Sequence, residues 1–128
     1  MTQEEKNLLL KDLCARLPYG VTVEIKGSYD DGERYIRISE LDITMLGYMY
    51  DDKSSIIPYL RPMSSMAEEE INEFILISDT VLWLGDKRST SILSLEQMDW
   101  LNSHHFDYRG LIEKGLALEA HEGMYGKI

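Results

Sequence analysis

The sequence is short of cysteine, of positive charge and of long apolar runs. Cys14 is the only cysteine among 128 residues, so no disulfide can form within the chain, and a reducing cytoplasm is the expected location. Lys and Arg number 13 against 23 Asp and Glu, a formal net charge of −10 at pH 7. General binding to nucleic acid requires a concentrated positive surface and is therefore excluded. No apolar run approaches the ~20 residues that a membrane-spanning helix needs, and the acidic residues 1–5 are unlike a secretory signal.

What is present is typical of a globular protein. Hydrophobic residues make up 44% of the chain, and they include eight Tyr and two Trp. This content is too apolar for a disordered protein, and the length suffices to bury one core. We therefore expect a single cytoplasmic domain over residues 1–128, with no membrane contact and no direct contact with nucleic acid.

The first segment predicts an amphipathic helix. Thr2 and Glu5 have the spacing of a capping box, in which a hydroxyl and a carboxylate each accept a hydrogen bond from a backbone amide. Pro18 ends the helix. The apolar positions recur at i, i+3, i+4 and i+7 on one face, and they are Leu10, Leu13, Cys14 and Leu17. Cys14 is accordingly expected to be a buried, unreactive thiol.

Residues 20–62 predict antiparallel strands joined by short turns. Apolar and polar residues alternate over 21–25 and again over 34–38, as in strands with one buried face. Residues 41–50 predict a third strand, bulged near Gly47, and residues 55–57 a short fourth. Two prolines keep residues 58–62 extended, and this segment is expected to end the sheet.

Two further helices follow. Ser65 and Glu68 form a second potential capping box, ahead of a helix over 66–77 whose buried stripe is Ala67, Ile71, Phe74 and Ile75. Ser94 and Gln97 form a third, ahead of a helix ending near 104–106 with Leu95, Met98, Leu101 and His105 on one face. Residues 80–93 resemble a hairpin, and 116–119 a final strand. The predicted fold class is α+β, with an antiparallel sheet of about four to five strands and three helices packed on one face.

Catalytic chemistry finds little support in the sequence. His104, His105 and Asp107 could ligate a metal, but adjacent residues on a helix point about 100° apart, whereas paired ligands need i, i+3 or i+4 spacing. The simpler interpretation is that one histidine packs on the helix, the other is solvated, and Asp107 caps the following turn. No nucleophile elbow or phosphate-binding glycine loop occurs. We assign no catalytic, cofactor-binding or metal-binding residue, and a hydrolase or metal-dependent enzyme using His104 and His105 is kept as the second alternative.

The strongest candidate for an interface lies near the third helix. Trp, Tyr and Arg dominate interface hot spots when they are exposed, although in a small domain they more often fill the core. The candidate interface residues are Trp100, His104, His105, Asp107, Tyr108 and Arg109. An exposed patch around Tyr108 and Arg109 would favour binding, and a deep polar pocket collecting His104, His105 or His121 would favour catalysis.

Acidic residues suggest a first alternative function. They are densest at 30–31, 51–52 and 68–70, where turn formation and the helix dipole explain most of them. A net charge of −10 also steers a protein toward basic partners. The alternative is therefore an acidic mimic or inhibitor that binds a basic nucleic-acid-binding protein.

Two segments resemble a family of short uncharacterised proteins found in gut bacteria and their prophages and mobile elements. They are PYLRPMSSM (58–66) and DWLNSHHFDYRGLIEKGLAL (99–118). Ala67 replaces the threonine expected there, which weakens the polar start of its helix. The resemblance implies a mobile-element context and no activity. The leading prediction is a small non-enzymatic accessory protein that binds a protein partner, with its oligomeric state left open.

Overall fold

The chain folds into an α+β structure with a five-stranded sheet, as predicted. The sheet is mostly antiparallel but mixed, whereas a purely antiparallel sheet was expected. The computed structural model describes residues 1–50, 54–77 and 94–125. The strands are β1 (Thr22–Ser28), β2 (Arg34–Glu40), β3 (Ser55–Pro62), β4 (Phe106–Asp107) and β5 (Leu118–Glu119). Their order is β2-β1-β3-β4, and β5 also pairs with β3. β1 is antiparallel to β2 and β3, whereas the two short late strands run parallel to β3.

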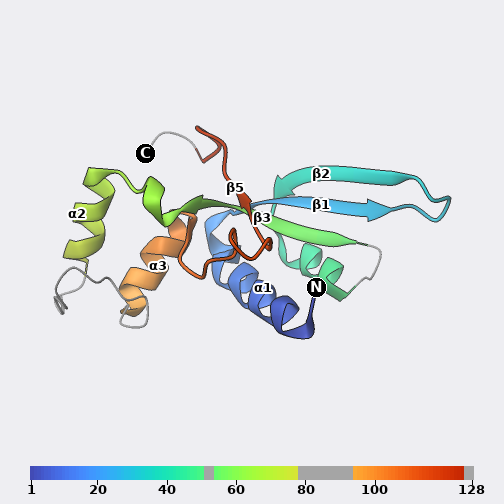
Figure 1. Ribbon diagram of the computed structural model, residues 1–128, viewed down its shortest axis with the longest axis horizontal. Coiled ribbons are helices and arrows are strands. Elements are labelled where there is room, and N and C mark those ends of the chain that lie inside the picture. The colour runs from blue at the N-terminus through green and yellow to red at the C-terminus, as the bar shows by residue number, and fades with distance from the viewer. Residues whose placement is uncertain (51–53, 78–93, 126–128) are drawn as a thin grey trace.

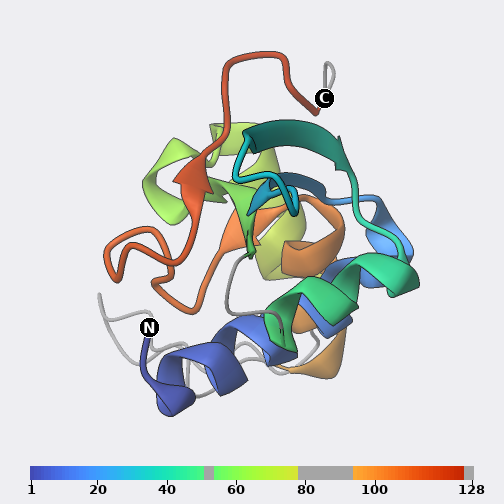
Figure 2. The ribbon, with the colours of Figure 1, turned by 90° about the vertical axis from the view of Figure 1, so that its right-hand side faces the viewer.

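The helices are α1 (Gln3–Arg16), α2 (Glu68–Leu76) and α3 (Leu95–Ser103), with 3-10 helices η1 (Leu17–Tyr19), η2 (Ile43–Tyr50) and η3 (Met63–Ser65). α1 and η2 lie on one side of the sheet, and the segment after β5 lies on the other (Figures 1 and 2). The β1–β2 hairpin projects from the end opposite α2 and α3 (Figure 1). None of the described helices is long and apolar enough to cross a membrane.

α1 buries a different face from the one predicted. The capping box of Thr2 and Glu5 is present as expected. The buried positions are Leu9, Asp12, Leu13 and Arg16, at i, i+3, i+4 and i+7. Cys14 lies on the exposed side, so the prediction of a buried thiol was wrong. Two of the four buried positions are the charged residues Asp12 and Arg16. A prediction that counts only apolar residues therefore places the buried face too far round the helix, on the side of Cys14.

Residues 41–50 were wrongly predicted as a strand. They form η2, which starts beside Asp42: the Asp42 side chain accepts hydrogen bonds from the Met45 amide and from the Thr44 hydroxyl. This local bond offers the backbone an alternative to a sheet ladder. Met45, Leu46, Tyr48 and Met49 pack on the core from this helix, whereas Ile43 and Tyr50 are exposed.

β3 continues through the segment that was expected to end the sheet. It runs from Ser55 to Pro62, so residues 55–57 and 58–62 are one strand and not a strand followed by a terminating segment. Its first half pairs with β1 up to the Val23–Pro58 pair, and its second half pairs with β5 from Tyr59 onward. Pro58 therefore lies where one partner ends and another begins, a position that tolerates the missing amide.

The later elements confirm two predictions and correct one. α3 begins at the predicted capping box of Ser94 and Gln97, and the final strand is present as β5. α2 begins at Glu68, with Ala67 as its N-cap residue and the Glu70 carboxylate accepting from the Ala67 amide at 3.0 Å. Ser65 donates to the Pro62 carbonyl, so the predicted Ser65–Glu68 box was wrong. The predicted hairpin at 80–93 lies outside the described residues.

The core has a main part and a smaller satellite. The main cluster joins α1 to the sheet through Leu9, Leu13, Val23, Ile25, Ile56 and Leu60, each at most 1% exposed, and Met49 of η2 packs in the same cluster. The satellite is centred on Trp100, Leu101 and Phe106, with Phe74 of α2 packed against it. The satellite therefore anchors α2 and α3 to the end of the sheet.

Candidate functional site

The predicted interface around Trp100 is turned inward. Trp100 is 7% exposed, and its indole nitrogen donates to Glu73 of α2 at 3.0 Å. His104 stacks on the indole ring with centroids 4.0 Å apart, and its Nδ1 lies 2.9 Å from the Trp100 carbonyl. His104 is thus half-buried against the helix and not freely solvated. This arrangement joins α2 to α3, and it leaves the Trp100 ring unavailable to a partner.

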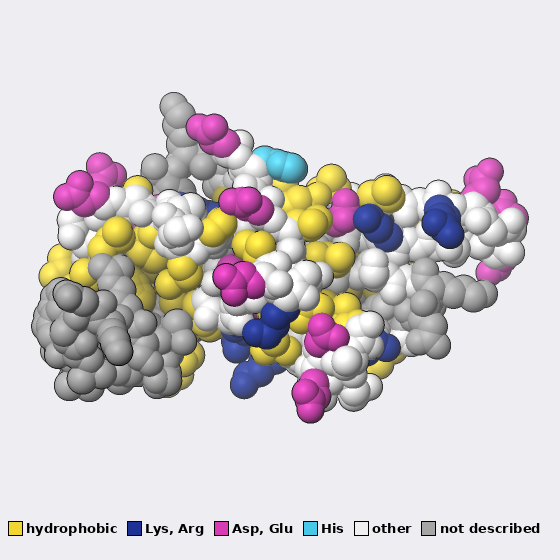
Figure 3. Space-filling model, in the orientation of Figure 1, with side chains coloured by type: hydrophobic (Ala, Val, Ile, Leu, Met, Phe, Trp, Pro, Cys, Tyr) yellow, Lys and Arg dark blue, Asp and Glu magenta, His cyan; other side chains and the backbone are white. Residues whose placement is uncertain are grey.

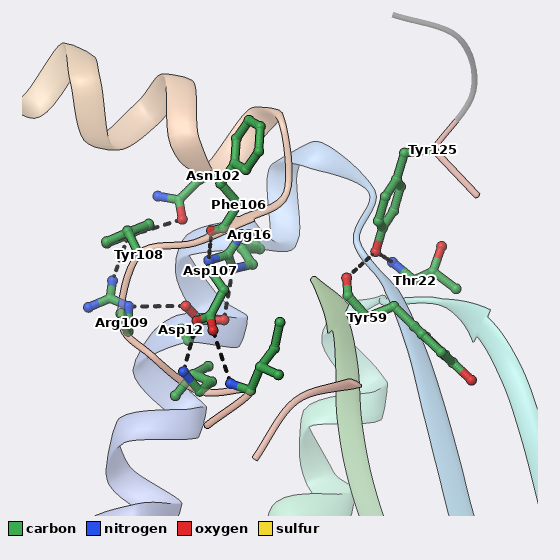
Figure 4. Close-up of polar contacts among 12 residues, drawn as sticks. Asp12, Arg16, Thr22, Tyr59, Asn102, Phe106, Asp107, Tyr108, Arg109 and Tyr125 are labelled. Atoms are coloured by element: carbon green, nitrogen blue, oxygen red, sulfur yellow. Dashed lines mark hydrogen bonds and ion pairs between the residues drawn. The ribbon is translucent and has the colours of Figure 1, made fainter. Parts of the chain in front are cut away.

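Arg16 and Asp12 form a fully buried ion pair beneath this segment (Figure 4). Arg16 Nε donates to Asp12 at 2.7 Å, and its Nη2 donates to the Phe106 carbonyl at 2.6 Å. Arg109 Nε donates to the second Asp12 oxygen at 3.1 Å. Asp12 therefore receives two guanidinium groups, which offset the cost of burying its charge. The pair ties α1 to β4 and to the loop that follows it.

Tyr108 and Arg109 extend this network instead of forming an exposed patch. Arg109 donates to the Tyr108 hydroxyl at 2.9 Å, and that hydroxyl donates to buried Asn102 at 3.1 Å. Figure 4 shows the chain of contacts running from Asn102 through Tyr108 and Arg109 to Asp12. Both residues are half-buried. Their hydrogen-bonding groups are used within the protein, which favours a structural role.

Asp107 caps the following turn, as the sequence predicted. Its two carboxylate oxygens accept from the Leu111 amide at 2.8 Å and the Ile112 amide at 3.0 Å. The side chain is buried, so the two amides would otherwise lack partners. This carboxylate is therefore not free to act as a metal ligand or general base.

His105 is buried in a left-handed conformation, with φ of 63°. Its carbonyl accepts from the Arg61 amide at 2.7 Å, and its ring stacks on Tyr125 at 3.7 Å. Burial, and then the positive charges of Arg16, His104 and Arg61, lower its pKa to about 4. The ring is thus neutral at pH 7. No group of three or more His, Cys, Asp or Glu able to hold a metal occurs among the described residues.

An acidic groove runs between α2 and the segment after β5. It encloses about 680 Å³ and contains one ion pair, in which Arg61 donates twice to Glu70 at 2.9 and 2.7 Å. The hydrogen bonds from Arg61 hold the pKa of Glu70 below its usual range. The remaining charged or titratable lining residues are Glu69, Glu73, Glu119, Glu122, His121 and Tyr125. Arg61 is already paired, so the other carboxylates leave the groove negative.

β2 is an edge strand with exposed apolar side chains. Within the described chain its only strand partner is β1. The Leu41 amide donates to Val21 and the Tyr29 amide donates to Glu33, so the odd-numbered residues of β2 form the bonded pairs with β1. The even-numbered residues therefore direct their backbone N–H and C=O groups outward. Two of them, Ile36 and Ile38, are 66% and 56% exposed.

The opposite face of β2 carries Tyr35, Arg37 and Ser39. Tyr35 lies over Gly27 of β1, where a Cβ atom would stand 2.4 Å from its hydroxyl oxygen. Two hollows of about 430 and 770 Å³ open beside the strand, and Arg37 and Tyr48 line both. β2 therefore combines free backbone groups, two exposed isoleucines and adjacent surface depressions.

Comparison with protein-family models, with curated proteins and with solved structures finds no match for this chain. The fold and the surfaces described above define it as an α+β protein with an open sheet edge and an acidic groove. The alternation over 34–38 correctly predicted a strand, which is present as β2. The prediction that its apolar face is buried was wrong, because Ile36 and Ile38 are exposed and the opposite face, with Tyr35 over Gly27, is the one turned toward the core.

Proposed function

We propose that this protein is a non-enzymatic interaction protein whose contact surface is the β2 edge. The observation that carries the proposal is the exposure of Ile36 and Ile38 on a strand whose outer edge has no strand partner among the described residues. Monomeric proteins protect such edges, because a free edge is a template for pairing with another chain. Addition of a strand to an exposed sheet edge is a common mode of protein recognition.

The hydrogen bonds of the residues around the third helix support this assignment. The polar groups of Asp107, Tyr108 and Arg109 bond to other groups within the protein. The second alternative, an enzyme using His104 and His105, is weakened because one ring stacks on Trp100 and the other is buried and neutral. The mobile-element context remains a proposal that rests on the resemblance of residues 58–66 and 99–118.

Site-specific photocrosslinking in cells tests the contact surface. A benzoylphenylalanine replaces Ile36 in one variant and Ile43, which is 71% exposed on η2, in a matched control. We expect a covalent adduct with a protein from position 36 and none from position 43. Adducts of equal yield at both positions, or none at position 36, would refute the proposal. The mass of the adduct identifies its class of partner.

The acidic groove supports the acidic-mimic alternative as a second candidate. Its lining contains glutamates without an ion-pair partner among the described residues, including Glu69 and Glu122. On the face shown in Figure 3, however, acidic side chains are spread along the molecule and not gathered into one patch. A basic partner would thus be bound by the groove and not by a broad negative surface.

A charge-reversal pair tests this second candidate. Glu69→Lys changes the groove, and Glu113→Lys makes the same change of charge at an exposed carboxylate outside it. In calorimetric titration with a Lys- and Arg-rich peptide, the groove variant should bind several times more weakly than the Glu113→Lys control, because close opposite charges determine such binding. Equal weakening in both variants would show a nonspecific effect of net charge and reject the groove.

A further inference from the structure

We infer that the partner of the β2 edge is a second copy of this chain, paired antiparallel across a two-fold axis beside Arg37. The inference rests on the proposed function, since it names the occupant of the same surface. An isologous contact requires a surface that complements itself after rotation. The residues of β2 meet this condition in one register.

Backbone geometry restricts the possible registers. The outward N–H and C=O groups belong to the even-numbered residues of β2, as the bonds to β1 establish. In an antiparallel pair, residues that exchange both hydrogen bonds lie directly opposite one another. Even-numbered residues of one copy must therefore face even-numbered residues of the other, and the registers differ in steps of two.

Side-chain chemistry selects one of these registers. With the axis beside Arg37, Ile36 faces the partner's Ile38 and Arg34 faces the partner's Glu40, and the same contacts repeat on the other side of the axis. Moving the register by one step in either direction places a charged side chain opposite an isoleucine. Cross-strand apolar pairs and opposite charges both stabilise a sheet. Arg34 and Glu40 form no ion pair within the described residues, so both are available.

The other face of β2 fits the same register. There Tyr35 of one copy lies opposite the partner's Ser39, beside the larger hollow that Ser39, Thr44 and Met45 line. Each Tyr35 ring lies over Gly27 of its own β1, so it does not extend across the edge and does not obstruct the pairing. The two Arg37 side chains meet at the axis, which is unfavourable, and Asp42 lines the same hollow and can offset their charge. The sheets of the two copies would join in the order β3-β1-β2-β2-β1-β3.

Charge reversal at the two ends of β2 tests both the dimer and its register. Sedimentation analysis over a wide concentration range should show a monomer–dimer equilibrium for the natural chain. Arg34→Glu places glutamates opposite each other at two symmetric positions, and Glu40→Arg does the same with arginines. Each variant should raise the dimer dissociation constant roughly tenfold or more.

Mixing the two variants provides the decisive measurement. In the mixed dimer, the Arg34→Glu side chain of one copy faces the Glu40→Arg side chain of the other, and the unchanged Glu40 of the first faces the unchanged Arg34 of the second, so association should return to the level of the natural chain. A natural chain that stays monomeric, or variants that dimerise normally, or a mixture that fails to recover would each overturn the inference. A crosslink from position 36 to a different protein would overturn it too, and would leave the proposed function standing.

Discussion

His105 shows at the scale of one residue how the fold imposes a conformation and a charge state together. Its backbone occupies the left-handed region at φ of 63°, which few non-glycine residues adopt and in which Asn, Asp and His are enriched among them. Its ring is buried against Tyr125. The conformation has a local origin, because His105 directly follows the C-cap residue of α3, where a left-handed residue commonly ends a helix. The burial of the ring has a distant origin, because Tyr125, which stacks on it, belongs to the segment after β5.

The depressed pKa of His105 predicts a pH dependence of stability. The folded-state pKa is about 4 and the unfolded value 6.5, so the unfolded chain binds more protons between these values. The stabilisation is complete above pH 6.5 and is lost as the pH falls toward 4, by up to about 3 kcal/mol. Urea unfolding between pH 5 and 7.5 measures it. The carboxylates that contribute in the same direction, such as Glu70, titrate below this window.

Asparagine substitutions separate His105 from other histidines. His105→Asn keeps a residue that tolerates positive φ and should flatten the dependence of the unfolding free energy between pH 5 and 6.5. The exposed His121→Asn should leave the slope unchanged. If both variants keep the slope of the natural chain, the buried imidazole is not its source.

Local contacts were predictable from the sequence and distant ones were not. Asp107 caps amides four and five residues away, within the range of a turn motif. Asp12 binds Arg109, 97 residues away, and no spacing rule connects the two. The groups that bond to Tyr108 and Arg109 come from α1 and α3, and no pattern in the neighbouring sequence indicates them.

At the scale of elements, α2 has an unfinished N-terminus. Ala67 occupies the N-cap position in an extended conformation, with no side chain to accept from the first helical amides. Glu70 already supplies the reciprocal half of a capping box by accepting from the Ala67 amide. The three glutamates of the first turn interact favourably with the helix dipole. A hydroxyl at position 67 would therefore supply the one hydrogen-bond acceptor that the N-cap still lacks.

Ala67→Ser should therefore stabilise the protein by about 0.5–1 kcal/mol, since Ser at the N-cap is favoured over Ala by this amount. The residue is exposed, so the change introduces no packing conflict. Thermal unfolding followed by circular dichroism measures the gain, and Ser64→Ala outside the helix provides a control for general surface effects. A loss of stability in Ala67→Ser would show that the cap geometry is different.

The predicted elements divide according to what determines them. Capping boxes and alternating strands are local, and those of α1, β1 and α3 were found. η2 was missed because one aspartate side chain starts a helical turn within an apolar segment that also suits a strand. β3 was cut short because Pro58 is normally a strand terminator, and only the change of partner from β1 to β5 makes it acceptable.

At the scale of the whole molecule, the two parts of the core differ in size. The main cluster joins α1 to three strands, whereas the satellite holds α2 and α3 through a few aromatic and aliphatic residues. Local opening of a small cluster requires less free energy than opening of the main core. The end of the molecule that carries the acidic groove should thus be the less stable one.

Hydrogen exchange followed by mass spectrometry tests this difference. Peptides covering residues 68–76 and 95–103 should lose protection faster than peptides covering 22–28 and 55–60, by roughly tenfold or more if the local opening free energies differ by about 1.4 kcal/mol. Trp100→Leu should widen the gap by weakening the satellite, while leaving the strand peptides unchanged. Equal protection in all four regions would show a single cooperative unit.

The topology of the sheet could not be predicted from the sequence because, as in the site, its contacts join residues that are far apart along the chain. Hairpin logic predicts neighbours in sequence, and it correctly pairs β1 with β2. It cannot predict that β4 and β5 return to run parallel to β3, because each is only two residues long and carries almost no pattern.

Because β3 pairs with strands both before and after it in the sequence, its pairing during synthesis is completed only when the last strand has been made. Its second half ends at Pro62, but its partner β5 begins at Leu118, and translation of the intervening residues takes roughly 3–11 s at about 5–20 residues per second. During that interval the nascent chain presents Tyr59 and Leu60, which are buried in the finished protein, beside an unpaired backbone. The ribosome-bound chain therefore exposes an aggregation-prone strand, and we expect chaperones to cover β3 until β5 has been synthesised.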